Sequence, residues 1–177
     1  MYGIQQMNNS RCVYRMVPRM IAPVAAVLLA GGLQADTYTW STNTTGAAQD
    51  GSGVWNTEAA NWVDAGGVHT TWDNTGGDTA AFGVGGTAGT VTVDADGVTI
   101  GGLLFNADVT GAYTLSGGPL TLSGTPVFTV NTNATIAAPL AGTVDFSKTG
   151  TGTLTLSSLN SSFDGDITIA QGTLAAK

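Results

Sequence analysis

The fold is decided near the carboxyl end, by Lys148-Thr149-Gly150-Thr151-Gly152-Thr153-Leu154-Thr155-Leu156-Ser157. Leucine alternates there with threonine or serine, which is the period-two pattern of a β-strand with one buried face. The run Gly152-Thr153-Leu154 recurs twenty residues later as Gly172-Thr173-Leu174. A repeat of this length predicts a solenoid, whose coils stack parallel and in register about 4.8 Å apart.

The same alternation of apolar residues with Thr or Ser extends upstream to residue 90. The further segments are 90–94, 97–105, 112–116, 119–123, 127–131, 134–140 and 165–170. We therefore expect an all-β parallel β-helix of roughly four coils over residues 90–177. An antiparallel β-sandwich is the alternative, because short strands at this spacing also suit that fold.

Residues 36–89 are less regular and hold all four tryptophans. An open coil exposes apolar surface and unpaired strand edges, so we interpret this region as an irregular, Trp-rich amino-terminal cap. A short helical turn is expected at 57–61, with Thr57 as its cap. The alternative for Trp55 and Trp62 is contact with carbohydrate, because exposed indole faces stack on sugars.

Residues 1–35 predict a secretory signal peptide. Three arginines precede the apolar run 21–30, and Ala35 is a small residue suited to cleavage. The run is too short for a permanent helical span, which takes about 20 residues. We expect cleavage after Ala35, an exported protein without a membrane span, and an extracellular or cell-surface location. A periplasmic location is expected if the protein has no route across an outer membrane.

Charge and cysteine content exclude several function classes. Beyond residue 35 the chain has two basic and twelve acidic residues, a formal net charge of −10. Such a surface does not attract nucleic acid. The one cysteine, Cys12, lies in the leader, so no thiol nucleophile or cysteine-bound metal is expected in the mature chain.

The carboxyl-terminal stretch resembles the autotransporter-associated β-strand repeat over residues 147–177. The matching positions are Lys148, Gly150, Gly152, Thr153, Leu154, Leu156, Asn160, Phe163, Gly165, Gly172, Thr173 and Leu174. The resemblance implies a right-handed parallel β-helix of the passenger class, exported with the help of secretion machinery. The pairs Trp55-Asn56 and Asn61-Trp62 resemble the amino-terminal part of the same class.

Candidate catalytic and metal-binding residues are few. Asp94 with Asp96, and Asp164 with Asp166, are spaced so that both members face the same side of a strand, as a carboxylate pair or half of a Ca²⁺ site requires. Aspartates that bond the local backbone at strand ends are the simpler interpretation. His69 is the only histidine, so it forms no catalytic triad and is expected in a surface loop.

We therefore expect no enzyme activity, no cofactor and no metal. The predicted function is that of a secreted or cell-surface structural β-helix passenger segment, a scaffold, stalk or adhesin-like module. Surface polysaccharide and host or matrix components are the candidate partners. The alternative is a carbohydrate-binding or carbohydrate-active β-helix module that uses Trp55, Trp62 and an aspartate pair.

Overall fold

The structure is a computed structural model, and it describes residues 35–75, 77–159 and 161–177. The predicted signal peptide, 1–35, lies outside the described residues except for Ala35. The described part contains strands and turns but no helix, and therefore no helix that could cross a membrane.

Within the described residues, sixteen strands form two sheets, one of six strands and one of ten. The six-stranded sheet consists of β2 (Gly53–Trp55), β6 (Thr90–Val93), β8 (Tyr113–Gly117), β10 (Ala134–Ile136), β13 (Thr153–Leu156) and β16 (Thr173–Ala176). The ten-stranded sheet contains β1 (Thr37–Trp40), β3 (Trp62–Val63), β4 (His69–Thr70), β5 (Thr79–Phe82), β7 (Val98–Phe105), β9 (Leu120–Val130), β11 (Leu140–Gly142), β12 (Phe146–Thr149), β14 (Ser162–Phe163) and β15 (Ile167–Ile169).

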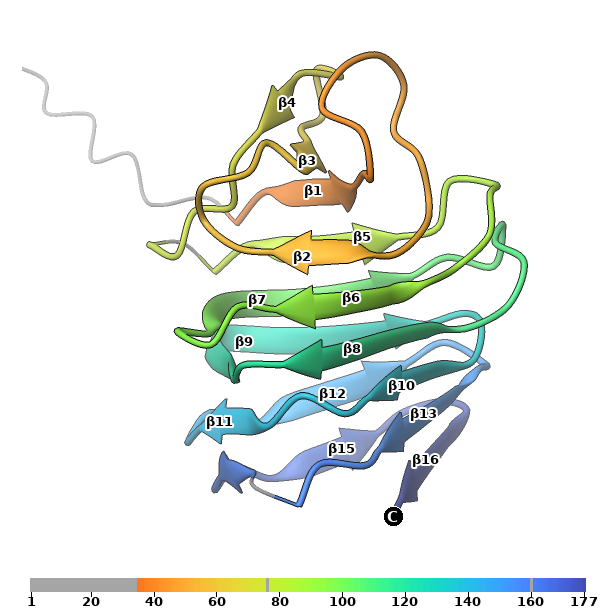
Figure 1. Cartoon of the computed structure of the whole chain (residues 1–177). Helices are drawn as coiled ribbons and strands as arrows, with labels where there is room; N and C mark the ends of the chain where they lie inside the picture. Colours follow the sequence, from red (N-terminus) through yellow and green to blue (C-terminus); the bar gives the residue numbers. More distant parts are fainter. Residues whose placement is uncertain (1–34, 76, 160) are drawn as a thin grey trace, which may run out of the picture. The chain divides into compact units, whose positions relative to one another are not determined.

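The chain alternates between the two sheets, so that each coil runs along the six-stranded sheet and returns along the ten-stranded one (Figure 1). Strands of successive coils pair in parallel: Thr135 lies beside Thr114 and Thr155, and Leu154 lies beside Leu174. Followed from β6 toward β16 in Figure 1, the chain winds around the stack axis as a right-handed coil. The predicted right-handed β-solenoid is confirmed, and the antiparallel sandwich is excluded.

Alternation along the strands builds the core. In β8, Tyr113 and Leu115 are buried and Thr114 is half-buried on the outer face, as the period-two pattern predicts. In β9 the inward residues include Phe128, which stacks on Phe146 of the next coil with ring centroids 4.4 Å apart. Stacking of like positions lets each coil bury apolar surface that it cannot cover alone.

The end of the stack nearest the amino terminus departs from the parallel pattern. β3 pairs antiparallel with β1 and β4, whereas β2 and β5 pair parallel with β6 and β7. The division into a cap at 36–89 and coils at 90–177 stays a prediction. The expected helical turn at 57–61 is wrong: the segment is a bend, held because the Asn56 side chain accepts hydrogen bonds from Glu58 N–H and Ala59 N–H.

Candidate functional site

The four tryptophans form one buried aromatic cluster at the amino-terminal end of the stack. Trp40, Trp55 and Trp62 are 0% exposed and Trp72 is 2% exposed. The ring centroids of Trp55 and Trp62 lie 4.7 Å apart, and those of Trp62 and Trp72 lie 4.8 Å apart. Neither indole therefore presents a face to solvent, which the predicted carbohydrate contact through Trp55 and Trp62 requires.

The indole N–H groups of this cluster are unequally satisfied. Trp40 Nε1 donates to the Gly51 carbonyl and Trp72 Nε1 to the Thr99 carbonyl, each at 3.1 Å. Within the described residues, the N–H groups of Trp55 and Trp62 have no acceptor. An unsatisfied buried donor costs about 1–3 kcal/mol, so aromatic burial must outweigh this cost and hold the two rings inside.

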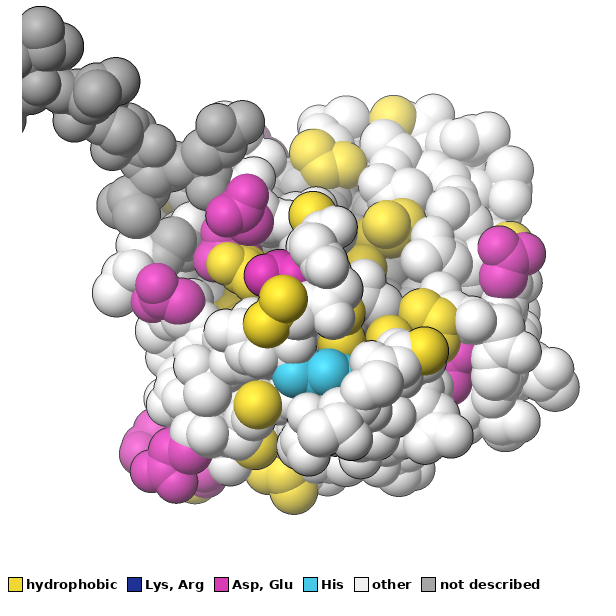
Figure 2. Space-filling view, turned by 90° about the horizontal axis from the view of Figure 1, so that it is seen from above, with side chains coloured by type: hydrophobic (Ala, Val, Ile, Leu, Met, Phe, Trp, Pro, Cys, Tyr) yellow, Lys and Arg dark blue, Asp and Glu magenta, His cyan; other side chains and the backbone are white. Residues whose placement is uncertain are grey.

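A view down on the tryptophan-containing end shows scattered apolar side chains among polar atoms, with several acidic side chains toward its edges (Figure 2). His69 lies half-buried in β4 rather than in a loop, within 3.0 Å of the Gly46 carbonyl through its Nε2. Among the described residues, no group of three or more His, Cys, Asp or Glu side chains could hold a metal ion.

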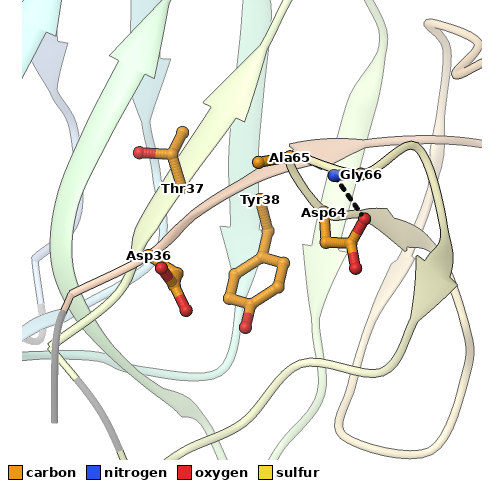
Figure 3. A pocket seen from close by; sticks show the side chains of 6 residues that line it. All are labelled: Asp36, Thr37, Tyr38, Asp64, Ala65 and Gly66. Atoms are coloured by element: carbon orange, nitrogen blue, oxygen red, sulfur yellow. Dashed lines mark hydrogen bonds between the residues drawn. The ribbon is translucent and has the colours of Figure 1, made fainter.

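A small acidic hollow of about 220 Å³ lies beside β1, lined by residues 36–38 and 64–66 (Figure 3). The Tyr38 ring lies between the side chains of Asp36 and Asp64 in this view. Asp64 Oδ1 accepts the Gly66 N–H at 2.9 Å, so this carboxylate holds its own turn. Burial, followed by the nearby carboxylates, raises the pKa of Tyr38. The hollow offers no basic group to an anion.

Asp78, next to this hollow, is buried and accepts the Asp36 N–H at 2.9 Å. Burial raises the pKa of the Asp78 carboxyl, and the Asp36 and Asp73 carboxylates add to the rise. The hydrogen bond from Asp36 opposes it. The pair therefore ties the first described residues to the β5 region, where Thr79 N–H also donates to the Asp36 carbonyl.

The two predicted aspartate pairs lie in turns at strand ends. Asp94 and Asp96 are exposed in the turn between β6 and β7, where the Asp94 carbonyl accepts the Gly97 N–H at 2.9 Å. Asp164 and Asp166 are exposed before β15, and Asp166 N–H donates to Asp145 Oδ1 of the preceding coil. These hydrogen bonds hold the backbone of the turns, as the simpler interpretation predicts.

One buried polar contact was not anticipated from the sequence. Asp50 Oδ1 accepts the Tyr113 O–H at 2.7 Å, and Asp50 Oδ2 accepts the N–H groups of Val84 and Gly86 at 2.8 and 2.7 Å. The Gly51 N–H donates to the Tyr113 oxygen at 3.1 Å. Burial, and the hydrogen bond to Asp50, raise the pKa of Tyr113. Two of these four contacts thus tie the loop at Asp50 to Tyr113 of β8, and the other two tie it to the segment that follows β5.

The repeat motif contains a lysine whose side chain is fully buried. Lys148 lies on the inward face of β12, is 0% exposed, and pairs with Phe128 on one side and Ile169 on the other. Its Nζ donates to the carbonyls of Gly150 at 3.1 Å, Thr149 at 3.3 Å and, in the next coil, Gln171 at 2.9 Å. Burial lowers the pKa of this amine. Lys148 therefore holds the corner of its own coil and joins it to the following one.

Glycines surround this corner because side chains do not fit. Gly150 and Gly172 have φ of +74° and +75°, a region that L side chains rarely adopt. A Cβ on Gly172 would lie 2.6 Å from Lys148 Nζ, and one on Gly152 would lie 2.4 Å from the Thr132 carbonyl oxygen. The remaining motif residues continue the ladders: Thr153 and Leu154 of β13 pair with Thr173 and Leu174 of β16. Leu156 pairs with Ala176, and Gly165 lies in the turn before β15.

The outer faces carry rows of hydroxyl side chains. On the six-stranded sheet, Thr90, Thr114, Thr135 and Thr155 follow one another in register. On the ten-stranded sheet the Thr129 and Thr149 hydroxyls lie 3.0 Å apart, bonded to each other across two coils. These rows bear no charge.

Two comparisons bear on this arrangement, and no solved structure matches the chain. A family model described as the passenger-associated-transport repeat matches residues 146–176. The chain is also 40% identical over 156 residues to the adhesin BmaC autotransporter of Brucella suis biovar 1 (strain 1330). That match covers 85% of this chain and 4% of the adhesin.

The repeat matched by the family model contains Lys148, its three carbonyl acceptors and the ladder strands β13 and β16. The buried lysine corner is thus a feature of the matched segment itself. The predicted resemblance is confirmed: residues 146–176 match the passenger-associated-transport repeat, and most of the chain is similar to a segment of an autotransporter adhesin.

Proposed function

We propose that this chain is a structural passenger segment, exported and exposed at the cell surface, that acts as a scaffold or adhesin-like module without catalysis. The observation that carries the proposal is the in-register stack of parallel coils, which continues through the matched repeat. Similarity to a segment of an autotransporter adhesin supports a surface role of the adhesin-like kind.

Export is the first step of the proposal, and it depends on the leader. Residues 1–35 would direct export and be removed after Ala35, leaving Asp36 as the first residue. The test is the mass of the chain recovered from a bacterial host after expression with its own leader. A product whose mass corresponds to a chain that begins at Asp36 supports the proposal. A product that keeps residues 1–35 and stays in the cytoplasm contradicts it. An Ala35→Glu variant, whose charged side chain does not suit the cleavage site, is expected to accumulate uncleaved.

Contact is the second step, and we assign it to the outer face of the six-stranded sheet. The hydroxyls of Thr114, Thr135 and Thr155 form an uncharged row that spans three coils. Hydroxyl groups donate and accept hydrogen bonds, so such a row suits a neutral polysaccharide or a matrix protein better than a charged polymer. The buried tryptophans leave the carbohydrate-active alternative without its stacking groups, and it is not proposed.

Beads coated with the chain test adhesion to immobilised surface polysaccharides and matrix proteins. Binding is expected to fall when Thr114, Thr135 and Thr155 are all replaced by Asp. The matched control replaces Thr121, a half-buried outward residue of the ten-stranded sheet that pairs with Thr99, by Asp. Equal binding by the triple variant would exclude the threonine row as the contact face. Absence of binding by the folded parent chain would remove the adhesin-like role and leave the scaffold role.

A further inference from the structure

Asp78 is a buried acid whose charged neighbours are also acidic. It is 6% exposed, and the ionisable groups that act on its carboxyl are Asp36 and Asp73. Asp78 Oδ1 accepts a hydrogen bond from the backbone N–H of Asp36 at 2.9 Å. Burial of an ionised carboxyl costs free energy unless a cation or several donors compensate for it. A neutral N–H compensates only in part, so a positive charge opposite Asp78 would be stabilising.

Backbone pairing holds both groups in place independently of the hydrogen bond between them. The Asp36 carbonyl accepts the Thr79 N–H at 2.8 Å, and the next residue, Thr37, lies beside Thr79 in the parallel pairing of β1 with β5. The Asp78 carbonyl accepts the Gly101 N–H of β7 at 2.7 Å. The sheet thus positions the Asp36 nitrogen at the Asp78 carboxyl, whichever bond this nitrogen makes to the residue before it.

We propose that removal of the leader converts the Asp36 nitrogen into an α-ammonium group that forms an ion pair with Asp78. This ion pair rests on the proposed function, because the ammonium exists only if cleavage occurs after Ala35. Hydrolysis breaks the bond between the Ala35 carbonyl carbon and the Asp36 nitrogen. The carbon takes the oxygen of the water molecule and becomes a carboxylate, and the nitrogen takes both protons. A neutral donor thereby becomes a cation at the same place.

The new charge would fix the start of β1 more firmly in the exported chain than in its precursor. Charge-assisted hydrogen bonds are shorter and about twice as strong as neutral ones. The surroundings favour a cation as well, since four carboxylates act on Tyr38 of β1, namely those of Asp36, Asp64, Asp73 and Asp78. β1 pairs with β3 and β5 and carries Trp40 of the aromatic cluster. Processing would therefore stabilise the tryptophan-containing end of the stack.

The rate at which an amine-reactive reagent labels the α-amine tests the ion pair. The chain is purified after export, its start at Asp36 is verified by mass, and labelling near neutral pH is followed by peptide mass, with Lys177 as the internal reference. Amines react in their neutral form, and a free α-amine has a pKa of about 7.7–8.0. The Asp78 carboxylate should keep the amine protonated to a higher pH. Asp78→Asn should therefore label about tenfold faster than the parent, which corresponds to a pKa difference of about one.

The matched control is Asp73→Asn. It removes a neighbouring charge from an exposed position, and asparagine keeps an oxygen that can accept the Thr75 N–H. Its α-amine should label nearly as slowly as that of the parent, because the carboxyl opposite the amine is unchanged. Circular dichroism verifies that both variants keep their β structure.

Urea unfolding as a function of pH is the second readout. A raised pKa of the α-amine in the folded chain gives stability that is complete below the ordinary pKa and is lost as the pH rises through the raised one. From about pH 7 to about pH 10, the urea midpoint of the parent should fall by about 0.5 M more than that of Asp78→Asn. The other titrating groups are the same in both chains, so they cancel in the comparison.

Equal labelling rates in the parent and in Asp78→Asn overturn the ion pair, and so does an equal loss of stability with pH. If Asp78→Asn does not fold, the labelling rate of the parent against pH decides, because it measures the pKa of the amine directly. A value within the ordinary range of about 7.7–8.0 overturns the ion pair. A mature chain that begins at another residue contradicts the proposed cleavage and the ion pair together, whereas a start at Asp36 with an ordinary amine overturns the ion pair alone.

Discussion

Replacement of Lys148 by methionine removes the ammonium group and keeps most of the buried aliphatic stem. The three carbonyls of Thr149, Gly150 and Gln171 then lose the donor that joins two coils. We expect the variant to fold into the same solenoid with reduced stability, and we expect the loss to be greatest in the coil formed by β14, β15 and β16.

The change in the free energy of unfolding is the difference between the hydrogen bonds that Lys148→Met loses and the desolvation cost that it removes. A hydrogen bond to a charged group contributes about 1.5–3 kcal/mol net, and a buried carbonyl left without a partner costs about 1–3 kcal/mol. Two of the three bonds, at 3.1 and 3.3 Å, are long, which weakens them. The variant also no longer buries an ammonium group, whose desolvation costs several kcal/mol in a protein interior. We expect a net loss of about 2 kcal/mol in the free energy of unfolding.

Urea unfolding followed by circular dichroism measures this loss. With a denaturant slope of about 2 kcal/mol per molar, the midpoint should fall by about 1 M urea. Hydrogen exchange locates the effect, because the N–H groups of Ala170 and Gln171 donate to the Lys148 carbonyl and should lose protection first. The control is Lys177→Met, which removes a charge from an exposed position and should change stability by less than about 0.5 kcal/mol.

The pH dependence provides an independent readout. Burial lowers the pKa of Lys148, so between its folded value and its ordinary value of 10.5 the unfolded chain binds more protons than the folded chain. The contribution of Lys148 to the free energy of unfolding therefore rises with pH in that window, and Lys148→Met should abolish this rise. A variant as stable as the parent chain, with unchanged exchange at Ala170, would refute the view that the lysine stabilises the corner.

Three further predictions follow from the buried contacts. Tyr113→Phe should cost about 1–3 kcal/mol at neutral pH, because it leaves Asp50 Oδ1 without the hydroxyl donor. Because the pKa of Tyr113 is raised in the folded chain, the parent should lose stability as the pH rises above 10.0. Urea unfolding across this pH range should show a smaller loss of stability in Tyr113→Phe. An equal loss in both chains would contradict a raised pKa for Tyr113. Trp55→Ala should cost about 3–5 kcal/mol in thermal or urea unfolding, and a loss below about 1 kcal/mol would show that the cluster is not a tightly packed core. Gly152→Ala should lower the melting temperature more than Gly77→Ala, whose Cβ would meet only the Ser123 hydroxyl, at 3.8 Å. Equal effects would mean that the corner adapts to a Cβ.

The parallel stack was predictable from the sequence because its signal is periodic. The twenty-residue recurrence of Gly-Thr-Leu placed Leu154 beside Leu174, and the structure confirms this register. Alternation between apolar residues and Thr identified the inward positions, since a pleated strand directs successive side chains to opposite faces. These inferences depend on local pattern and spacing, which a single sequence contains.

The contacts that escaped prediction join residues without a periodic relation. Asp50 meets Tyr113 across 63 residues, and no local pattern marks either residue as a partner. Lys148 was recognised as a repeat position, but lysine is almost never fully buried unless it is paired, so its inward orientation was not foreseen. Trp55 and Trp62 were open to two interpretations because tryptophan serves both cores and binding surfaces, and only their packing distinguishes the two.

The packed tryptophan cluster bears on how the protein responds to a pulling force. Coils contact only their neighbours, so they separate one at a time, and the most weakly packed coil separates first. The four indoles pack on one another beside the first coils, with ring centroids as close as 4.7 Å. Under load, the coils beyond this cluster should therefore separate before the tryptophans do. Such an order gives graded extension before complete loss of structure.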